Sequence, residues 1–278
     1  MKRILVPTDF SKNATNAIKF AYLLSKKAGS KISLLNIYTF AVYDPNMPPE
    51  ILADTIKIDS NNSSEGLDMQ IAQLEREIPD IKNYLGEKIV LEGATADEIY
   101  RTAEEHNYDL ILMGTKGASG IEEALIGTNA YSVISKSKVP VLVVPDKSLY
   151  KEFQNILYCV DLNSDEAPAI EEMKSIIDVN KSSITFLHLS SELNDKVTFE
   201  ERGYIDLIKE KMGDVSYKIE FAKSDDIADT IEEYSKKLET DLIIISKKER
   251  GFFEHLFHKS ISKKLACHTD IPLLALQK

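Results

Sequence analysis

The stretch DLILMGTKGASGIEEALIGT, Asp109 to Thr128, decides the fold class. It opens with DLILM, a short apolar run typical of a buried strand, and NAYSVISKSK, a pattern typical of a helix, follows it. Between the two, Gly114, Gly117, Gly127 and Thr128 have the spacing G-x2-G-x9-G-(S/T). Glycines at a strand-to-helix turn let backbone N–H groups approach an anion, and the start of the helix adds free N–H groups and the positive end of its dipole. The stretch therefore predicts a phosphate-binding turn and favours a nucleotide as ligand.

The composition limits the classes of function. A length of 278 residues suits one large domain or two ordinary ones. The net charge of −11 argues against a nucleic-acid binder and against a protein that docks on an anionic membrane. Two cysteines are too few for a disulfide framework, MKRILVPTDF is no signal peptide, and no segment reaches the roughly 20 apolar residues of a membrane span. We therefore expect a soluble, cytoplasmic protein.

The chain contains the same pattern twice. RILVPTDF, from Arg3, matches NILYCVDL, from Asn155, and KISLLNIY matches SITFLHLS at the same offset of 152. DLILMGTKG, from Asp109, matches DLIIISKKE, from Asp241, and VPVLVV matches IPLLAL at an offset of 132. The second copy has therefore lost about 20 residues in its middle. We expect two domains, residues 1–146 and 153–278.

Each copy alternates short apolar runs with helical patterns, which predicts an α/β fold with a parallel sheet and helices on both faces. The first helix is expected to begin at Ser11, a good N-cap, and to end near Gly29. Its apolar face consists of Ala14, Ala17, Ile18, Ala21 and Leu24. Ligands of such sheets bind at the carboxyl ends of the strands, where Asp9 and Gly114 fall.

A Pro-, Asn- and Ser-rich insert, Val42 to Gly66, follows the second strand of the first copy. It predicts a solvated loop, and a lid or a partner surface is the alternative. The next residues, Leu67 to Ile78, have the pattern of an amphipathic helix. Another helix is expected to open at Thr95 or Asp97.

These residues resemble the universal stress protein family in its tandem two-domain form. The resemblance covers nearly the whole chain and depends on VPTD (Val6 to Asp9), on the glycine turn and on the closing VPVLVVP (Val139 to Pro145). It implies two Rossmann-like domains, each with a five-stranded parallel sheet in the order 3-2-1-4-5. Members of the family with the glycine motif bind ATP, and members without it generally do not.

The resemblance also implies which residues of the first copy bind the nucleotide. They are Pro7, Thr8, Asp9, Ile37, Met113, Gly114, Lys116, Gly117, Gly127, Thr128 and Asn129. Asp9 would lie near the ribose and phosphates and help to hold a nucleotide-bound Mg²⁺, although a carboxylate there could also be only a helix cap. Ile37 would meet the adenine, and Lys116 would either add charge to the phosphates or point to water. ATP, ADP and AMP all remain possible ligands.

The second copy lacks all three glycines. Ser246, Glu249, Lys259 and Ser260 stand at the corresponding positions, and Glu249 would place a carboxylate where a phosphate should lie. We therefore expect a degenerate domain that does not bind ATP in the family's manner. Members of the family commonly dimerise through their last strands, so VPVLVV and IPLLAL could pair within one chain. A further homodimer is compatible with the sequence.

No established catalytic motif is visible in the chain, whether a Walker lysine, a G-x-S-x-G elbow or H-E-x-x-H. Zinc ligation by His255, His258, Cys267 and His268 is an alternative, but their spacing matches no standard zinc motif, and the apolar residues nearby favour packing. Cys159 is expected to be a small core residue. The leading hypothesis is an ATP-binding stress-response regulatory protein with little or no catalysis. Its alternatives are a slow ATP hydrolase or transferase and a nucleotide-independent interaction scaffold.

Overall fold

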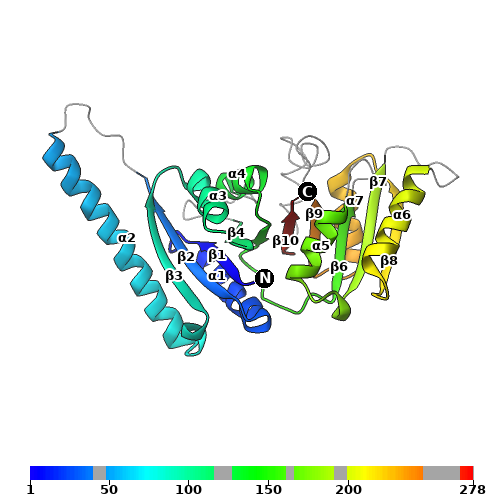
Figure 1. Ribbon diagram of the computed structural model, residues 1–278, viewed down its shortest axis with the longest axis horizontal. Helices are drawn as coiled ribbons and strands as arrows, with labels where there is room; N and C mark the ends of the chain where they lie inside the picture. The colour runs from blue at the N-terminus through cyan, green and yellow to red at the C-terminus, as the bar shows by residue number, and fades with distance from the viewer. Residues whose placement is uncertain (40–47, 116–126, 161–165, 191–198, 247–269, 278) are drawn as a thin grey trace. The chain divides into compact units, whose positions relative to one another are not determined.

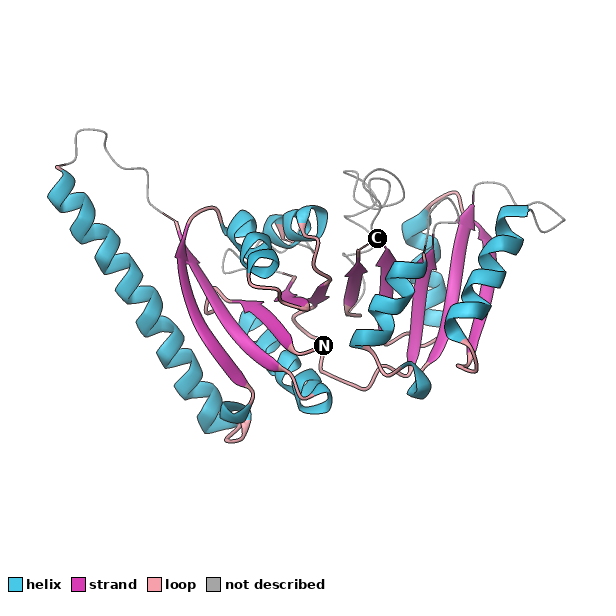
Figure 2. Cartoon of the chain, viewed as in Figure 1, coloured by secondary structure: helices cyan, strands magenta, loops and turns pink. Residues whose placement is uncertain are grey.

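The computed structural model describes residues 1–39, 48–115, 127–160, 166–190, 199–246 and 270–277, which Figure 1 draws as ribbon. The chain divides into two compact units, one ending at Asp146 and the other beginning at Lys147. Each unit is an α/β layer structure in which helices lie against a sheet (Figure 2). None of the helices in these described ranges is long and apolar enough to cross a membrane.

The first unit contains a parallel sheet in the order β3-β2-β1-β4-β5, as the sequence predicts. Its strands are β1 (Arg3–Pro7), β2 (Lys31–Tyr38), β3 (Leu85–Glu92), β4 (Leu110–Gly114) and β5 (Val141–Val144). Its helices are α1 (Lys12–Ala28), α2 (Pro49–Glu77), the 3-10 turn η1 (Ile81–Asn83), α3 (Thr95–Glu105) and α4 (Thr128–Lys136). Right-handed crossovers in this strand order place α1 and α2 on one face of the sheet and α3 and α4 on the other.

Helix α1 has the ends that the sequence predicts. The Ser11 hydroxyl accepts a hydrogen bond from the Ala14 N–H at 3.1 Å, which caps the start of the helix. Gly29 has a φ of 68°, a left-handed conformation that glycine adopts without strain, and its N–H donates to the Ser25 carbonyl at 2.8 Å. The whole predicted apolar face of this helix is buried.

The predicted loop from Val42 to Gly66 is wrong from Pro49 onward, because α2 begins there; residues 42–47 lie outside the described residues. Pro49 suits the first turn of a helix, where a missing N–H costs nothing. The polar run that follows is poor in helix formers, but a tertiary anchor offsets this weakness. The anchor is the buried face formed by Ser63, Leu67, Gln70 and Leu74 in the C-terminal part of α2. The expected helices from Leu67 and from Thr95 are confirmed.

The second unit repeats this architecture in the order β10-β9-β6-β7-β8. Its strands are β6 (Asn155–Val160), β7 (Ser183–Ser190), β8 (Tyr217–Lys223), β9 (Leu242–Ser246) and β10 (Leu273–Leu276). Its helices are α5 (Ala167–Ile176), the 3-10 turn η2 (Val179–Lys181), α6 (Phe199–Met212) and α7 (Ile227–Lys237). Reading from the first strand of the unit, the order is again 3-2-1-4-5, so the predicted fold class is confirmed for both halves.

The strand registers confirm the repeat residue by residue. Val6 pairs with Leu34 in the first unit, and Tyr158 pairs with Phe186 in the second, both at the offset of 152. The pairing of β4 with β5 recurs between β9 and β10 at the offset of 132. The shortening falls between the second and third strands, where α6 has 14 residues and α2 has 29. Cys159 is 1% exposed in the core of its unit, as expected.

Candidate functional site

The turn after β1 holds the first group of candidate residues at the carboxyl edge of the sheet. Thr8 is buried, and its N–H donates to the Leu35 carbonyl at 2.8 Å. The Phe10 N–H donates to the Thr8 hydroxyl at 3.1 Å, and the Ser11 N–H donates to the Asp9 carboxylate at 3.1 Å. Ser11, rather than Asp9, is the N-cap of α1. The Asp9 carboxylate is therefore an exposed group on a turn whose backbone is fixed on both sides.

The end of β4 leaves space beside this turn because residue 114 is glycine. A Cβ atom built on Gly114 would lie 3.3 Å from both the backbone carbonyl carbon and the oxygen of Asn13, in the first turn of α1. Such a contact is tighter than ordinary van der Waals packing, so a side chain here would press on the start of α1. Glycine thus allows β4 and α1 to approach each other closely.

Helix α4 begins beside the end of β4. The Gly127 N–H donates to the Thr115 carbonyl at 2.5 Å, and Gly127 has φ −62° and ψ 156° at the N-cap position. Any residue adopts this backbone conformation, so the turn itself does not require glycine. What glycine contributes is the absence of a side chain: none among the described residues caps this end of α4. The first N–H groups of the helix, at the exposed Thr128 and Asn129, are available to an anion.

The structure brings most of the predicted site residues to one edge of the first sheet. β1 pairs with β4 on one side and with β2 on the other, so the turn after β1 lies between the ends of both strands. Pro7, Thr8 and Asp9 follow β1, Ile37 is half-buried near the end of β2, and Met113 and Gly114 end β4. Lys116 and Gly117 lie outside the described residues.

Polar residues that the sequence reasoning missed support this edge. Asn36 is 6% exposed and its side-chain amide donates to the Thr8 carbonyl at 2.7 Å. Gln70 of α2 is 7% exposed and its amide oxygen accepts from the Thr8 hydroxyl at 2.9 Å. An amide within the apolar run KISLLNIY was a visible signal for Asn36, because buried polar groups need partners. No such signal marked Gln70, which belongs to an ordinary amphipathic pattern.

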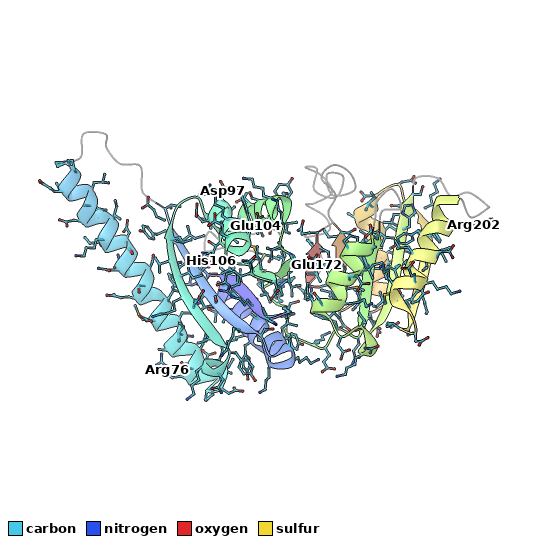
Figure 3. All side chains as sticks on the ribbon, viewed as in Figure 1. Arg76, Asp97, Glu104, His106, Glu172 and Arg202 are labelled. Atoms are coloured by element: carbon cyan, nitrogen blue, oxygen red, sulfur yellow. The ribbon has the colours of Figure 1, made fainter. Side chains whose placement is uncertain are left out.

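An ion pair and a backbone hydrogen bond hold the far end of α4 against α3. The Lys136 ammonium donates to Asp97 of α3 at 2.7 Å, and this hydrogen bond lowers the pKa of the Asp97 carboxyl. Glu104, also on α3, accepts from the Lys138 N–H at 3.0 Å. Figure 3 labels Asp97 and Glu104, which both belong to α3. With its C-terminal end held on α3, α4 presents its N-terminus to the site.

In the second unit, a cluster of buried polar side chains occupies the positions that correspond to Val6, Ala14 and Gly114. Glu166 is fully buried, and its carboxylate accepts from the Tyr158 hydroxyl at 3.0 Å and from the Ser246 hydroxyl at 2.9 Å. By the repeat offsets, Tyr158 corresponds to Val6, Glu166 to Ala14 and Ser246 to Gly114. Burial and the charge of Glu166 raise the pKa of Tyr158 well above its ordinary value. Glu249, Lys259 and Ser260 lie outside the described residues, as do His255, His258, Cys267 and His268.

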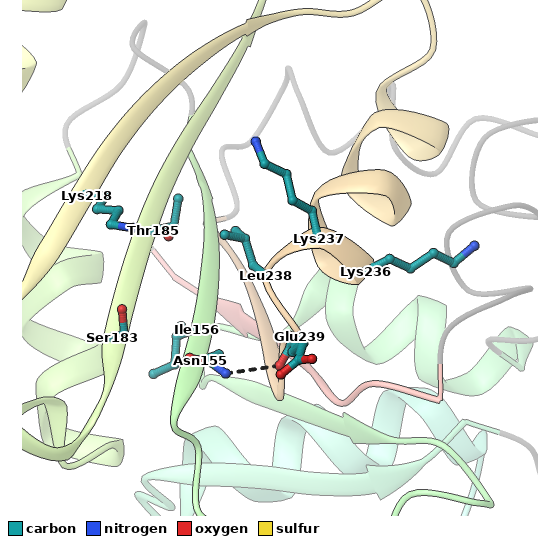
Figure 4. A pocket seen from close by; sticks show the side chains of 9 residues that line it. All are labelled: Asn155, Ile156, Ser183, Thr185, Lys218, Lys236, Lys237, Leu238 and Glu239. Carbon is teal, nitrogen blue, oxygen red and sulfur yellow. Dashed lines mark hydrogen bonds between the residues drawn. The ribbon is translucent and has the colours of Figure 1, made fainter.

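Another concave region of the second unit lies at the opposite edge of its sheet (Figure 4). It is a pocket of about 410 Å³ at the amino ends of β6, β7 and β8 and the C-terminal end of α7. Two of its lysines are already engaged, since Lys236 pairs with Glu232 at 2.5 Å and Lys237 lies 5.0 Å from the Tyr234 ring centroid. The C-terminal end of a helix also disfavours anions. This pocket is therefore not the candidate site.

The strand order and the site at the carboxyl edge define a tandem α/β protein of the Rossmann-like class. The model of the universal stress protein family matches residues 1–145 and 152–277. The chain therefore belongs to the universal stress protein family.

Individual relatives cover one half of the chain or all of it. The universal stress protein MJ0577 of Methanocaldococcus jannaschii is 28% identical over 160 residues, which are 53% of this chain and 96% of that protein. The universal stress protein YxiE of Bacillus subtilis is 30% identical over 148 residues, which are 51% of this chain and 97% of that protein. The crystal structure of a universal stress protein from Archaeoglobus fulgidus covers 99% of this chain and 96% of its own, with a TM-score of 0.66 and 18% identity. That likeness shows the fold of the full tandem chain.

Proposed function

We propose that the first domain, residues 1–146, binds one adenine nucleotide per chain, ATP being the leading candidate over ADP and AMP. The observation that carries this proposal is the start of α4 at Gly127, which no side chain in the described part of the chain caps, beside the end of β4 and the Asp9 turn. A helix start without a side-chain cap is a site for phosphate oxygens. Membership in the universal stress protein family, in which the glycine motif accompanies ATP binding, supports the same ligand.

The donor groups of the site fit a nucleotide-bound Mg²⁺ better than a dedicated metal centre. Mg²⁺ in proteins commonly keeps several waters and binds through one or two carboxylates together with substrate phosphates. The exposed Asp9 carboxylate supplies one such ligand. No group of three or more His, Cys, Asp or Glu residues in the described part of the chain could hold a metal by itself. Asp9 would therefore contact Mg²⁺ only when the nucleotide brings it.

We further propose that residues 153–278 form a non-binding domain. The Glu166 carboxylate, held by two hydroxyl donors, would repel a phosphate, and the first domain has the uncharged Ala14 at the corresponding position. The proposed role of the protein is regulatory, with ATP hydrolysis weak or absent. Cytoplasmic location, pairing of the two domains through their last strands, and a homodimer stay predictions.

Substitutions at Gly127 test the nucleotide site without unfolding the protein. Asp is a good N-cap and fits the observed backbone, so Gly127→Asp should stabilise α4 while placing a carboxylate where the phosphates bind. We expect at least a hundredfold weaker ATP binding with Mg²⁺ in isothermal titration calorimetry. Gly127→Asn is the matched control of equal shape without the charge, and we expect it to lose about tenfold, since one capped N–H is worth roughly 1 kcal/mol. Unchanged affinity in Gly127→Asp would refute the site.

The same preparations separate the alternative functions. A hydrolase or transferase would release phosphate over many turnovers from labelled ATP, and Asp9→Ala would abolish that release. An interaction scaffold would bind its partner equally well with and without nucleotide and in Gly127→Asp. Small molecules released by denaturing the freshly purified protein, identified by mass spectrometry, would show whether ATP, ADP or AMP is carried.

A further inference from the structure

A chain of hydrogen bonds links both sides of the Asp9 turn through one side chain of α2. The Phe10 N–H donates to the Thr8 hydroxyl at 3.1 Å, and that hydroxyl donates to the Gln70 amide oxygen at 2.9 Å. The Gln70 amide nitrogen then donates to the Thr15 hydroxyl at 3.1 Å, which donates to the Ser11 carbonyl at 3.0 Å. The chain starts and ends within the turn, so Gln70 closes a bridge across Asp9.

The turn needs such support because its backbone is strained. Phe10 has a φ of 63°, a left-handed conformation that is uncommon for a large side chain. Its ring packs on α2 at Gly66, where a built Cβ atom would lie 2.6 Å from the ring atom Cζ. Gly66 and Gln70 are four residues apart, so they lie on the same face of the helix. One face of α2 thus contacts the turn at two points.

The part of α2 that makes these contacts is also the part that is anchored. All four buried residues of α2, Ser63, Leu67, Gln70 and Leu74, lie in its C-terminal half. Gln70 is the one among them whose hydrogen bonds reach the turn after β1. Burial keeps this bridge out of water, where its hydrogen bonds would compete with solvent.

We propose that Gln70 is a positioning residue of the nucleotide site: with Gly66, it holds the strained Thr8–Ser11 turn so that Asp9 is preorganised for the nucleotide and its Mg²⁺. This inference rests on the proposed nucleotide binding by the first domain. Gln70 does not touch the ligand. Its effect passes through Thr8 and Thr15, which fix the backbone on the two sides of Asp9.

Gln70→Met tests the bridge because it keeps the length and helix propensity of the side chain while removing both hydrogen bonds. We expect the Kd for ATP with Mg²⁺ to rise about tenfold, which is the size of one or two net hydrogen bonds. Thr8→Val, which removes the hydroxyl that donates to Gln70, should have a similar effect. The double variant Thr8→Val/Gln70→Met should bind no more weakly than the weaker single variant, because one bridge is lost in each case.

Leu74→Ala is the control for a purely structural role of α2. Leu74 is fully buried on the same helix, so its truncation lowers the melting temperature more than Gln70→Met does. Measured well below the melting temperature, its ATP affinity should stay within twofold of wild type. Gly66→Ala should raise the helix propensity of α2 yet weaken ATP binding, since the added methyl displaces Phe10.

The outcomes separate this inference from the proposed function. Saturable ATP binding by wild type, together with an unchanged Kd in Gln70→Met, overturns the positioning role alone. Equal losses in Leu74→Ala and Gln70→Met overturn it as well, because they indicate general loosening of α2. A wild-type protein without saturable nucleotide binding overturns the proposed function and the inference with it.

Discussion

We predict that the second domain loses stability as the pH rises toward neutrality, because the partly buried Glu172 becomes ionised. Glu172 lies on α5 and is labelled in Figure 3. Its carboxyl group accepts a hydrogen bond at 2.8 Å from the N–H of Gln277, the residue just after β10. Its burial raises its pKa from 4.5 to about 7, although the Gln277 N–H acts in the opposite direction. This hydrogen bond joins the end of the last strand to α5, and the half-buried side chain is partly shielded from water.

The direction follows from proton linkage. Below pH 4.5 Glu172 is protonated in both the folded and the unfolded protein, and its burial carries no charge cost. Between pH 4.5 and about 7 the unfolded chain gives up the proton first, so the free energy of unfolding falls through this range and then levels off. A pKa of about 7 instead of 4.5 corresponds to at most about 3 kcal/mol. Partial exposure of the side chain reduces the expected cost to about 1–2 kcal/mol.

Glu172→Gln isolates this contribution. The amide oxygen can still accept from the Gln277 N–H, and the charge is absent at every pH. The difference in free energy of unfolding between variant and wild type, from urea denaturation followed by circular dichroism, should be near zero at pH 4. At pH 8.5 the variant should be more stable by about 1–2 kcal/mol.

Glu171→Gln is the matched control. The Glu171 carboxylate is next to Glu172 in sequence, but it is exposed and pairs with Lys174 at 3.5 Å and Lys211 at 3.8 Å. Loss of these exposed pairs should make the protein equally or slightly less stable at pH 8.5. Hydrogen exchange of α5 and β10 peptides locates the effect in the second domain. A Glu172→Gln variant with the same stability as wild type at both pH values would refute the reasoning.

Two further predictions concern buried groups of the second domain. Glu166→Ala leaves the Tyr158 and Ser246 hydroxyls without their acceptor, so it should cost about 2–4 kcal/mol in urea unfolding, and adding Tyr158→Phe should restore part of the loss. An unchanged unfolding midpoint in Glu166→Ala would contradict the buried cluster. Burial raises the pKa of the Cys159 thiol to about 12, so native protein at pH 8 should leave Cys159 unmodified by iodoacetamide, whereas urea-unfolded protein should react there. Peptide mass spectrometry measures this, and rapid labelling of the native protein would show that the thiol is accessible.

The sequence alone predicts those parts of the fold that depend on local pattern and on repetition. The strand runs, the Ser11 cap and the Gly29 terminus of α1 follow from hydrophobic periodicity and capping chemistry, and the structure confirms them. The two repeat offsets recur in the strand registers, where the pair Val6–Leu34 corresponds to the pair Tyr158–Phe186. Local pattern failed at α2, where a Pro-, Asn- and Ser-rich stretch reads as a loop. Packing of Leu67 and Leu74 outweighs those weak propensities, and no local window contains that information.

The candidate site likewise contains some residues that local sequence patterns indicate and others that depend on tertiary contacts. The glycines and Asp9 could be selected as candidates because their residue types and spacing suit the chemistry, and their role in binding stays a prediction. Gln70 could not be predicted, because its partner Thr8 is 62 residues away in sequence and the contact exists only after α2 has docked. The repeat aligns Glu166 with Ala14, so the sequence shows a charged residue at a position that is apolar in the first copy. A buried carboxylate needs hydrogen-bond partners, and the sequence does not show which residues supply them. The structure identifies Tyr158 and Ser246 as the two donors.

The two halves of the chain carry different residues at the same place on the sheet. In the first domain Gly114 carries no side chain, which lets β4 approach the start of α1. In the second, Ser246 occupies the matching position and its hydroxyl joins β9 to Glu166 at the start of α5. The lost glycine has therefore acquired a structural use, since the serine satisfies a buried carboxylate that water cannot reach. Reverting Ser246 to glycine alone would leave Glu166 with one donor fewer and its charge still in place. On our proposal that the second domain does not bind a nucleotide, restoring a site there requires removal of the carboxylate together with the hydroxyls that donate to it.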